Sequence, residues 1–196
     1  MNEEMLIKMA QNGDGDAFNQ LMDDYFKKIY NIAFRMANNA DDAADMTQEI
    51  MIKLFKNISS FSGNSKFSTW VYRVATNTCL DELKKLKRHK NFSIDKDIET
   101  DDGEYSYEVE DISPSPETLS EQKELKSIVA SAIGMLNPDH KAVLVLRDIQ
   151  GLSYDEIARI VKCTEGTVKS RISRARAQLK IIIENNFNID GTYFKT

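Results

Sequence analysis

Apolar residues recur every three or four positions along much of this chain, a spacing that places them on one face of an α-helix. In residues 14–89 the pattern predicts three long helices: one through Met36, one from Asp41 to Ile58, and one from residue 68 or 69 to about Lys87. Residues 57–68, which separate the last two, are rich in Ser, Gly and Asn and predict a loop. The period is clearest in the first helix, at Phe18, Leu21, Tyr25, Ile29, Ile32 and Met36.

A second helical block ends in two closely spaced helices. Ser153 and Glu156, three residues apart, have the spacing of a capping box at the start of a short helix. Residues 162–164 predict a tight turn, in which Thr164 caps the helix that follows. Residues 151–180 are therefore predicted to form a helix-turn-helix.

The segment between the two blocks has a different composition. Residues 91–119 carry ten carboxylates and one cation, Lys96, and include Ser113-Pro114-Ser115-Pro116. Such a segment buries too little apolar surface to order itself, which predicts a flexible linker. The predicted fold class is all-α, with two small helical domains, residues 1–90 and 120–196, joined by an acidic linker at residues 91–119.

Composition narrows the possible functions. The 196-residue chain is 41% hydrophobic, enough for real cores, and has a net charge of -5. Cys79, Cys163, His89 and His140 do not have metal-ligand spacing, so we expect no metal site and no cofactor. No nucleophile–base pair or phosphate loop is evident, so neither an enzyme nor a small-molecule substrate is expected. The acidic N-terminus lacks a signal-peptide layout, and no apolar run reaches membrane-spanning length, which predicts a cytoplasmic protein.

Positive charge is concentrated in the second helix of the predicted helix-turn-helix. Helical spacing puts Val168, Ile172, Ala175 and Leu179 on a buried face, and Ser170, Ser173, Arg174 and Ala177 on the opposite face. Lys169, Arg171, Arg176 and Lys180 lie on the flanks. Small residues between basic flanks suit a helix that enters the DNA major groove, although a solvated basic face is the alternative.

A second basic cluster follows the third long helix. Five cations and a histidine fall within residues 84–90, and Lys84, Lys85, Lys87 and Arg88 are candidates for contacts with DNA phosphates. Favourable interaction with the helix dipole is the alternative explanation of this cluster.

Three stretches, in the expected order, resemble the bacterial RNA polymerase sigma factors of the extracytoplasmic-function (group 4) type within the sigma-70 family. Residues 41–56 resemble their core-polymerase-binding region, 61–81 their promoter -10 reading and melting region, and 151–180 their -35 reader. The resemblance implies a transcription initiation factor whose partners are core RNA polymerase, through its β′ clamp and β flap, and promoter DNA. It also implies control by an anti-sigma factor, which in some relatives is held in the membrane.

The resemblance assigns a role to each matching residue. Contacts with the β′ clamp helices are implied for Asp45, Gln48 and Glu49. Capture of a flipped -10 base is implied for Phe61 and Asn77, although Phe61 could instead pack into the core and Asn77 could be a surface amide. Base reading at -35 is implied for Lys169, Ser170, Ser173 and Arg174, and backbone contact for Thr167, Arg171 and Arg176. Ser173 stands where relatives often carry a larger side chain, so the -35 sequence itself cannot be transferred.

Two other functions are compatible with parts of this pattern. A helix-turn-helix regulator that is not a polymerase subunit would explain residues 151–180, but not the aromatic and basic residues of 61–81. A helical enzyme would need a catalytic constellation that the sequence does not offer.

Overall fold

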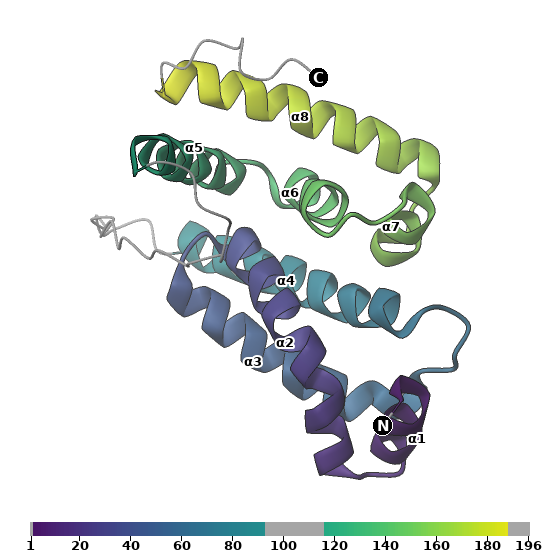
Figure 1. Cartoon of the computed structure of the whole chain (residues 1–196). Coiled ribbons are helices and arrows are strands. Elements are labelled where there is room, and N and C mark those ends of the chain that lie inside the picture. The colour runs from purple at the N-terminus through teal and green to yellow at the C-terminus, as the bar shows by residue number, and fades with distance from the viewer. Residues whose placement is uncertain (1, 93–115, 188–196) are drawn as a thin grey trace.

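The computed structural model describes the backbone of residues 2–92 and 116–187 and the side chains of residues 2–86 and 125–187. Within these ranges the regular structure is helical, which confirms the predicted all-α class (Figure 1). The elements are α1 (Glu3–Gln11), α2 (Gly15–Ala37), α3 (Ala40–Asn57), a 3-10 turn η1 (Ile58–Ser60), α4 (Phe67–Phe92), α5 (Pro116–Gly134), α6 (Pro138–Leu144), a π-helical turn η2 (Val145–Ile149), α7 (Tyr154–Val161) and α8 (Glu165–Phe187). No helix in the described parts of the chain is both long and apolar enough to cross a membrane.

Helices α2, α3 and α4 form the N-terminal block, and each packs against the other two. Asp14 and Asn39 cap the starts of α2 and α3 by accepting hydrogen bonds from backbone N–H groups three residues ahead. All six apolar residues whose period predicted the first helix are buried. In α3, by contrast, the apolar Ala44 and Phe55 face outward, and Phe55 is 48% exposed.

Helix α1 was not predicted by the hydrophobic pattern. It is capped by Asn2, and Leu6, Ile7 and Ala10 are its buried residues. Its packing is secured by Tyr25, whose hydroxyl donates a hydrogen bond of 2.6 Å to Glu3 Oε1. A nine-residue helix with three buried positions contains too few repeats of the apolar spacing to be recognised in the sequence. Its stability depends on packing beside α2.

Helices α5 to α8 form the C-terminal block, in which α8 lies across α5, α6 and α7 (Figure 1). Asn137 caps α6 and Pro138 occupies its first position. The boundaries near the predicted linker differ from the expectation, since α4 continues to Phe92 and α5 begins at Pro116 rather than at residue 120. The rest of the predicted linker, residues 93–115, lies outside the described residues, so the proposed domain limits stay a prediction.

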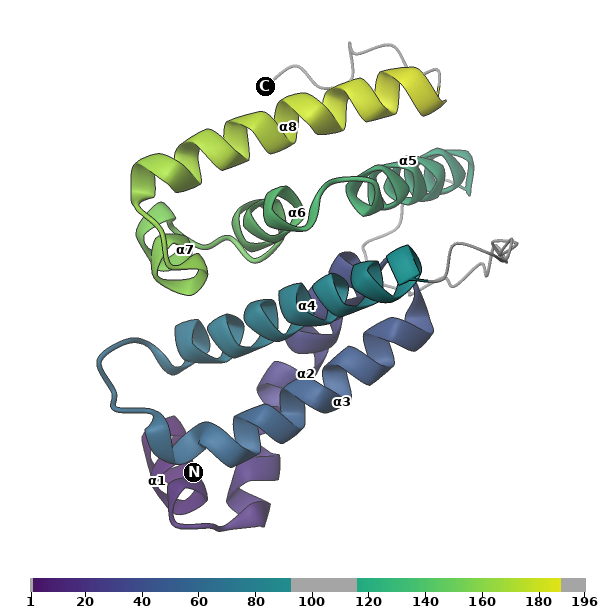
Figure 2. The same cartoon turned by 180° about the vertical axis from the view of Figure 1, so that it is seen from behind.

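The two blocks pack directly on each other. Figures 1 and 2 show α4 between α2 and α3 on one side and α6 and α7 on the other. One continuous apolar core contains residues of both blocks, including Val71 from α4, Val143 from α6 and Ile157 from α7. The sequence predicted two domains joined by an acidic linker and did not indicate whether they touch.

Candidate nucleic-acid interface

The helix-turn-helix predicted at residues 151–180 is present, and hydrogen bonds between residues close in sequence fix the starts of its helices. Ser153 Oγ accepts from the N–H of Glu156 at 3.2 Å, and the N–H of Ser153 donates to Glu156 Oε2 at 2.9 Å, which completes the capping box. Helix α7 ends at Lys162, whose backbone is left-handed with φ of 53°. Thr164 Oγ1 then accepts from the N–H of Thr167 at 3.2 Å and caps α8. Both helices thus start, and α7 also ends, through contacts within a few residues.

The capping box also changes the acidity of its carboxylate. The N–H of Ser153 hydrogen-bonds the charged form of Glu156 and lowers the pKa of this carboxyl, with a smaller contribution from Lys66. A negative charge in the first turn of α7 also suits the helix dipole.

Helix α8 presents the predicted faces. Val168, Ile172 and Ala175 are buried, and Leu179 is half-buried at the end of the same stripe. The opposite face, Ser170, Ser173, Arg174 and Ala177, is exposed. Small side chains in the middle of this face let the helix backbone approach base edges closely.

The basic side chains on the flanks of α8 are partly oriented by neighbours. Arg176 donates two hydrogen bonds to Asp148, from Nε at 3.2 Å and from Nη2 at 2.5 Å, and this pairing raises the pKa of Arg176. Lys169 Nζ lies 5.4 Å from the ring centroid of Tyr154, whose ring also meets the Arg147 guanidinium at 4.6 Å. The sequence analysis did not predict that Asp148 and Tyr154 would contact the basic side chains of α8.

Arg171 and Arg174 are placed differently. Across the described residues neither guanidinium forms an ion pair or a hydrogen bond with another side chain. Arg174 is exposed in the middle of the open face, so its five donors remain available to a ligand.

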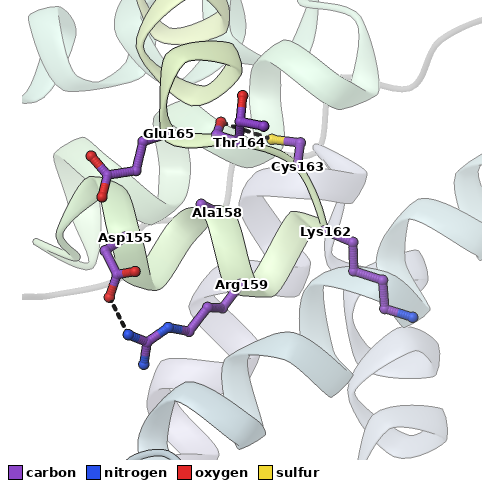
Figure 3. A pocket seen from close by; sticks show the side chains of 7 residues that line it. All are labelled: Asp155, Ala158, Arg159, Lys162, Cys163, Thr164 and Glu165. Atoms are coloured by element: carbon purple, nitrogen blue, oxygen red, sulfur yellow. Dashed lines mark hydrogen bonds and ion pairs between the residues drawn. The ribbon is translucent and has the colours of Figure 1, made fainter.

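A shallow depression of about 540 Å³ lies at the turn between α7 and α8 (Figure 3). It is lined by Asp155, Ala158, Arg159, Lys162, Cys163, Thr164 and Glu165. Asp155 and Arg159 pair with each other at 2.5 Å, and the Lys162 side chain points away from them (Figure 3). Among the described residues, no group of three or more His, Cys, Asp or Glu side chains is placed to hold a metal ion.

Phe61 belongs to an aromatic cluster at the start of α4. Its ring centroid lies 5.1 Å from that of Phe67 and 5.8 Å from that of Trp70. Trp70 is 4% exposed, as expected of a core residue, whereas Phe61 is half-buried at the edge of the core. Gln11 Nε2 holds the Phe61 backbone by donating to its carbonyl at 2.8 Å. The loop that follows Phe61 therefore begins at a residue whose backbone is held in place.

Asn77 lies on the least buried side of α4. Arg73, Asn77 and Lys84, which follow one another at spacings of four and seven, share this face, with Arg73 and Asn77 half-buried and Lys84 exposed. Across the described residues the Asn77 amide makes no side-chain hydrogen bond, so its donors and acceptor are open. The side chains of Lys87 and Arg88 lie outside the described residues.

Comparison with known proteins decides the family. Residues 21–89 match the Sigma-70 region 2 family and residues 126–179 match the Sigma-70, region 4 family. The chain is 39% identical over 176 residues to the ECF RNA polymerase sigma factor SigW of Bacillus subtilis. The matched residues cover 89% of this chain and 92% of SigW. It is 38% identical over 176 residues to the ECF RNA polymerase sigma-E factor of Escherichia coli K12, covering 90% and 91% of the two chains.

The chain belongs to the sigma-70 family, and its type is ECF. It is therefore a sigma factor, a transcription initiation factor that binds core RNA polymerase and promoter DNA. The fold is shared with two solved structures: RpoE of Bartonella quintana with the anti-sigma factor NepR (TM-score 0.66, 24% identity, 86% of this chain and 98% of that one), and CnrH with the cytosolic domain of CnrY (TM-score 0.64, 22% identity, 94% and 98%).

An acidic groove of about 400 Å³ runs between α3 and α4 of region 2 of this sigma factor. It is lined by Asp42, Asp45, Met46, Glu49, Glu82, Lys85 and Leu86. Two residues predicted to bind polymerase, Asp45 and Glu49, meet here, and Gln48 is exposed next to them. Lys85 lies in the same groove and donates to Glu82 Oε1 at 2.7 Å, which raises the pKa of its ammonium. Lys85, which was predicted to contact DNA phosphates, thus lies beside Asp45 and Glu49, which were predicted to bind polymerase.

Proposed function

We propose that region 4 of this sigma factor reads the -35 element with the open face of α8. Arg174 and Lys169, with Ser170 and Ser173, would contact base edges, and Thr167, Arg171 and Arg176 would contact phosphates. The observation that carries this proposal is the exposed guanidinium of Arg174, which has no ion-pair partner among the described residues and is centred between small side chains. An arginine so placed can bond a guanine through two parallel donors.

Region 2 is proposed to capture a flipped -10 base between the loop that starts at Phe61 and the amide of Asn77. Extruding a base costs a few kcal/mol of stacking, which stacking and edge hydrogen bonds at the pocket must offset. The half-buried ring of Phe61 and the open amide of Asn77 support this assignment. Lys84, Lys87 and Arg88 would hold the neighbouring phosphates, and Lys85 would do so only after leaving Glu82.

The acidic groove with Asp45, Gln48 and Glu49 is proposed to bind the β′ clamp helices, while region 4 binds the β flap. The protein would act by binding rather than by catalysis, in the cytoplasm, and an anti-sigma factor would compete for these surfaces. RpoE of Bartonella quintana, which shares this fold, forms a complex with the anti-sigma factor NepR.

Pull-down of core polymerase followed by run-off transcription tests this function. We expect the chain to bind core enzyme and to direct transcription from a specific promoter. Sequence-specific DNA binding that neither requires nor recruits polymerase would instead indicate a helix-turn-helix regulator.

A further inference from the structure

One side chain of helix α1 reaches the start of the loop that follows Phe61. Gln11, the last residue of α1, donates from Nε2 to the backbone carbonyl of Phe61 at 2.8 Å and to that of Ile58 at 3.1 Å. Figures 1 and 2 show α1 against the end of α3, where the chain turns through η1 toward this loop. Both N–H donors of the amide are thus used on a segment that follows about 50 residues later.

The loop itself has little internal support. Within the described part of the chain, residues 62–65 form no hydrogen bond and no ion pair. The path of the loop is therefore set at its two ends. At the far end the carbonyl of Lys66 accepts from the N–H of Trp70 in the first turn of α4. At the near end Gln11 holds the carbonyl of Phe61.

A second series of contacts links α1 to the ring of Phe61. The hydroxyl of Tyr25 donates to Glu3 of α1 at 2.6 Å. The Tyr25 ring meets Phe67 edge-on, with centroids 5.5 Å apart, and Phe67 meets Phe61 edge-on at 5.1 Å. Tyr25 and Phe67 are buried, and close-packed side chains transmit a displacement to their neighbours. Helix α1 therefore supports both the carbonyl and the ring of Phe61.

The hydrogen bonds of Gln11 do more than satisfy buried carbonyls. The carbonyl of Ile58 already accepts from the N–H of Phe61 at 3.1 Å. Because a peptide unit is planar, holding the Phe61 carbonyl also fixes the direction in which the chain leaves toward Ser62. This support comes from outside the matched region, since the match to Sigma-70 region 2 begins at residue 21.

We propose that Gln11 is a positioning residue for reading of the -10 element, because it holds the loop after Phe61 in the arrangement that captures the flipped base. The inference rests on the base capture by Phe61 and Asn77 proposed above. It adds a residue of α1 that acts through the loop rather than by touching the base. A loop held in its binding arrangement loses less conformational freedom when the base enters, which tightens capture without a new contact.

The variant Gln11→Leu tests this role, because leucine has a similar volume but no donor for the two carbonyls. Gln20→Leu is the matched control, since it makes the same change at an exposed position of α2. Each full-length chain is assembled into holoenzyme, and its binding to a single-stranded oligonucleotide with the non-template -10 sequence is measured. Replacing one nucleotide at a time by an abasic one identifies the position at which the wild type captures a base.

The wild-type and Gln20→Leu holoenzymes should lose affinity when that base is removed. The Gln11→Leu holoenzyme should bind the intact oligonucleotide about tenfold more weakly than wild type and the abasic one equally well. Tenfold corresponds to a loop that takes up the capturing arrangement about one tenth of the time. Affinity for core polymerase and the melting temperature of the free chain should match those of wild type.

A Gln11→Leu holoenzyme with the wild-type preference for the intact oligonucleotide, or with equal losses on both oligonucleotides, would overturn the positioning role and leave the proposed base capture intact. If Gln11→Leu does not fold, Gln11→Glu replaces it, because the glutamate side chain has the same length and its carboxylate only accepts hydrogen bonds. If no abasic position weakens binding of the wild-type holoenzyme, the proposed base capture is itself wrong, and the role of Gln11 falls with it.

Discussion

Replacing Arg174 and Arg176 separately should distinguish reading of the -35 sequence from attachment to its backbone. Arg174 has no ion-pair partner among the described residues and lies on the open face, so Arg174→Ala removes a candidate base contact. A good bidentate pair discriminates by about 1–3 kcal/mol, which corresponds to roughly 5- to 160-fold weaker binding to the preferred element. Binding to scrambled elements should change much less.

Arg176 differs from Arg174 because it is already paired with another side chain. Two of its donors bind Asp148, and its Nη1 remains for a phosphate. The Arg176 and Asp148 side chains are 52% and 33% exposed, so their pair contributes at most about 1 kcal/mol to folding. Arg176→Ala should therefore fold normally and weaken binding to all sequences by similar factors. It should also reduce the slope of log affinity against log salt by about 0.9.

The assay is binding of each variant holoenzyme to promoters with matched and scrambled -35 elements over a range of salt concentrations. Melting temperatures of the free proteins serve as the control for folding. If the two variants lose the same factor on both promoters and show the same salt slope, the orientation of α8 toward the groove is wrong.

Three further predictions concern other parts of the chain. Asn77→Ala should form few open complexes on a duplex promoter but recover on a template with a pre-opened -10 bubble, because that template already carries the unpairing cost; permanganate footprinting measures both, and equal defects would point to folding or core binding instead. Reversal of Asp45 and Glu49 to Lys should abolish binding to core polymerase with little change in melting temperature, since exposed charges contribute little to stability; unchanged affinity would remove these residues from the interface. Glu156→Gln should lower the unfolding free energy by about 1 kcal/mol or less at neutral pH. Since the folded pKa of Glu156 lies below its ordinary 4.5, this stabilisation is present above pH 4.5 and lost as pH falls below it. Urea unfolding of wild type and variant at several pH values checks this. A difference in unfolding free energy between the two proteins that stays constant into acid would contradict it.

The sequence by itself determined the local structure of the -35 reader. Ser153 caps α7 with Glu156 three residues away, and Thr164 caps α8 through Thr167, also three residues away. Such hydrogen bonds join groups whose separation is set by helix geometry alone, so they can be inferred without knowing what packs around them. The exposed position of Arg174 follows for the same reason, because helical spacing opposes it to Val168 and Ile172.

Tertiary structure decided which side chains meet across long sequence separations. Arg176 reaches Asp148, 28 residues earlier, and Lys141 reaches the Met36 carbonyl across 105 residues. Whether Phe61 packed inside or outside was open in the sequence, and the answer, an edge position beside Phe67, depends on how α4 lies against the loop. These contacts are selected by the angle and distance at which whole helices pack, and those follow from the combined burial of many apolar side chains rather than from any local spacing.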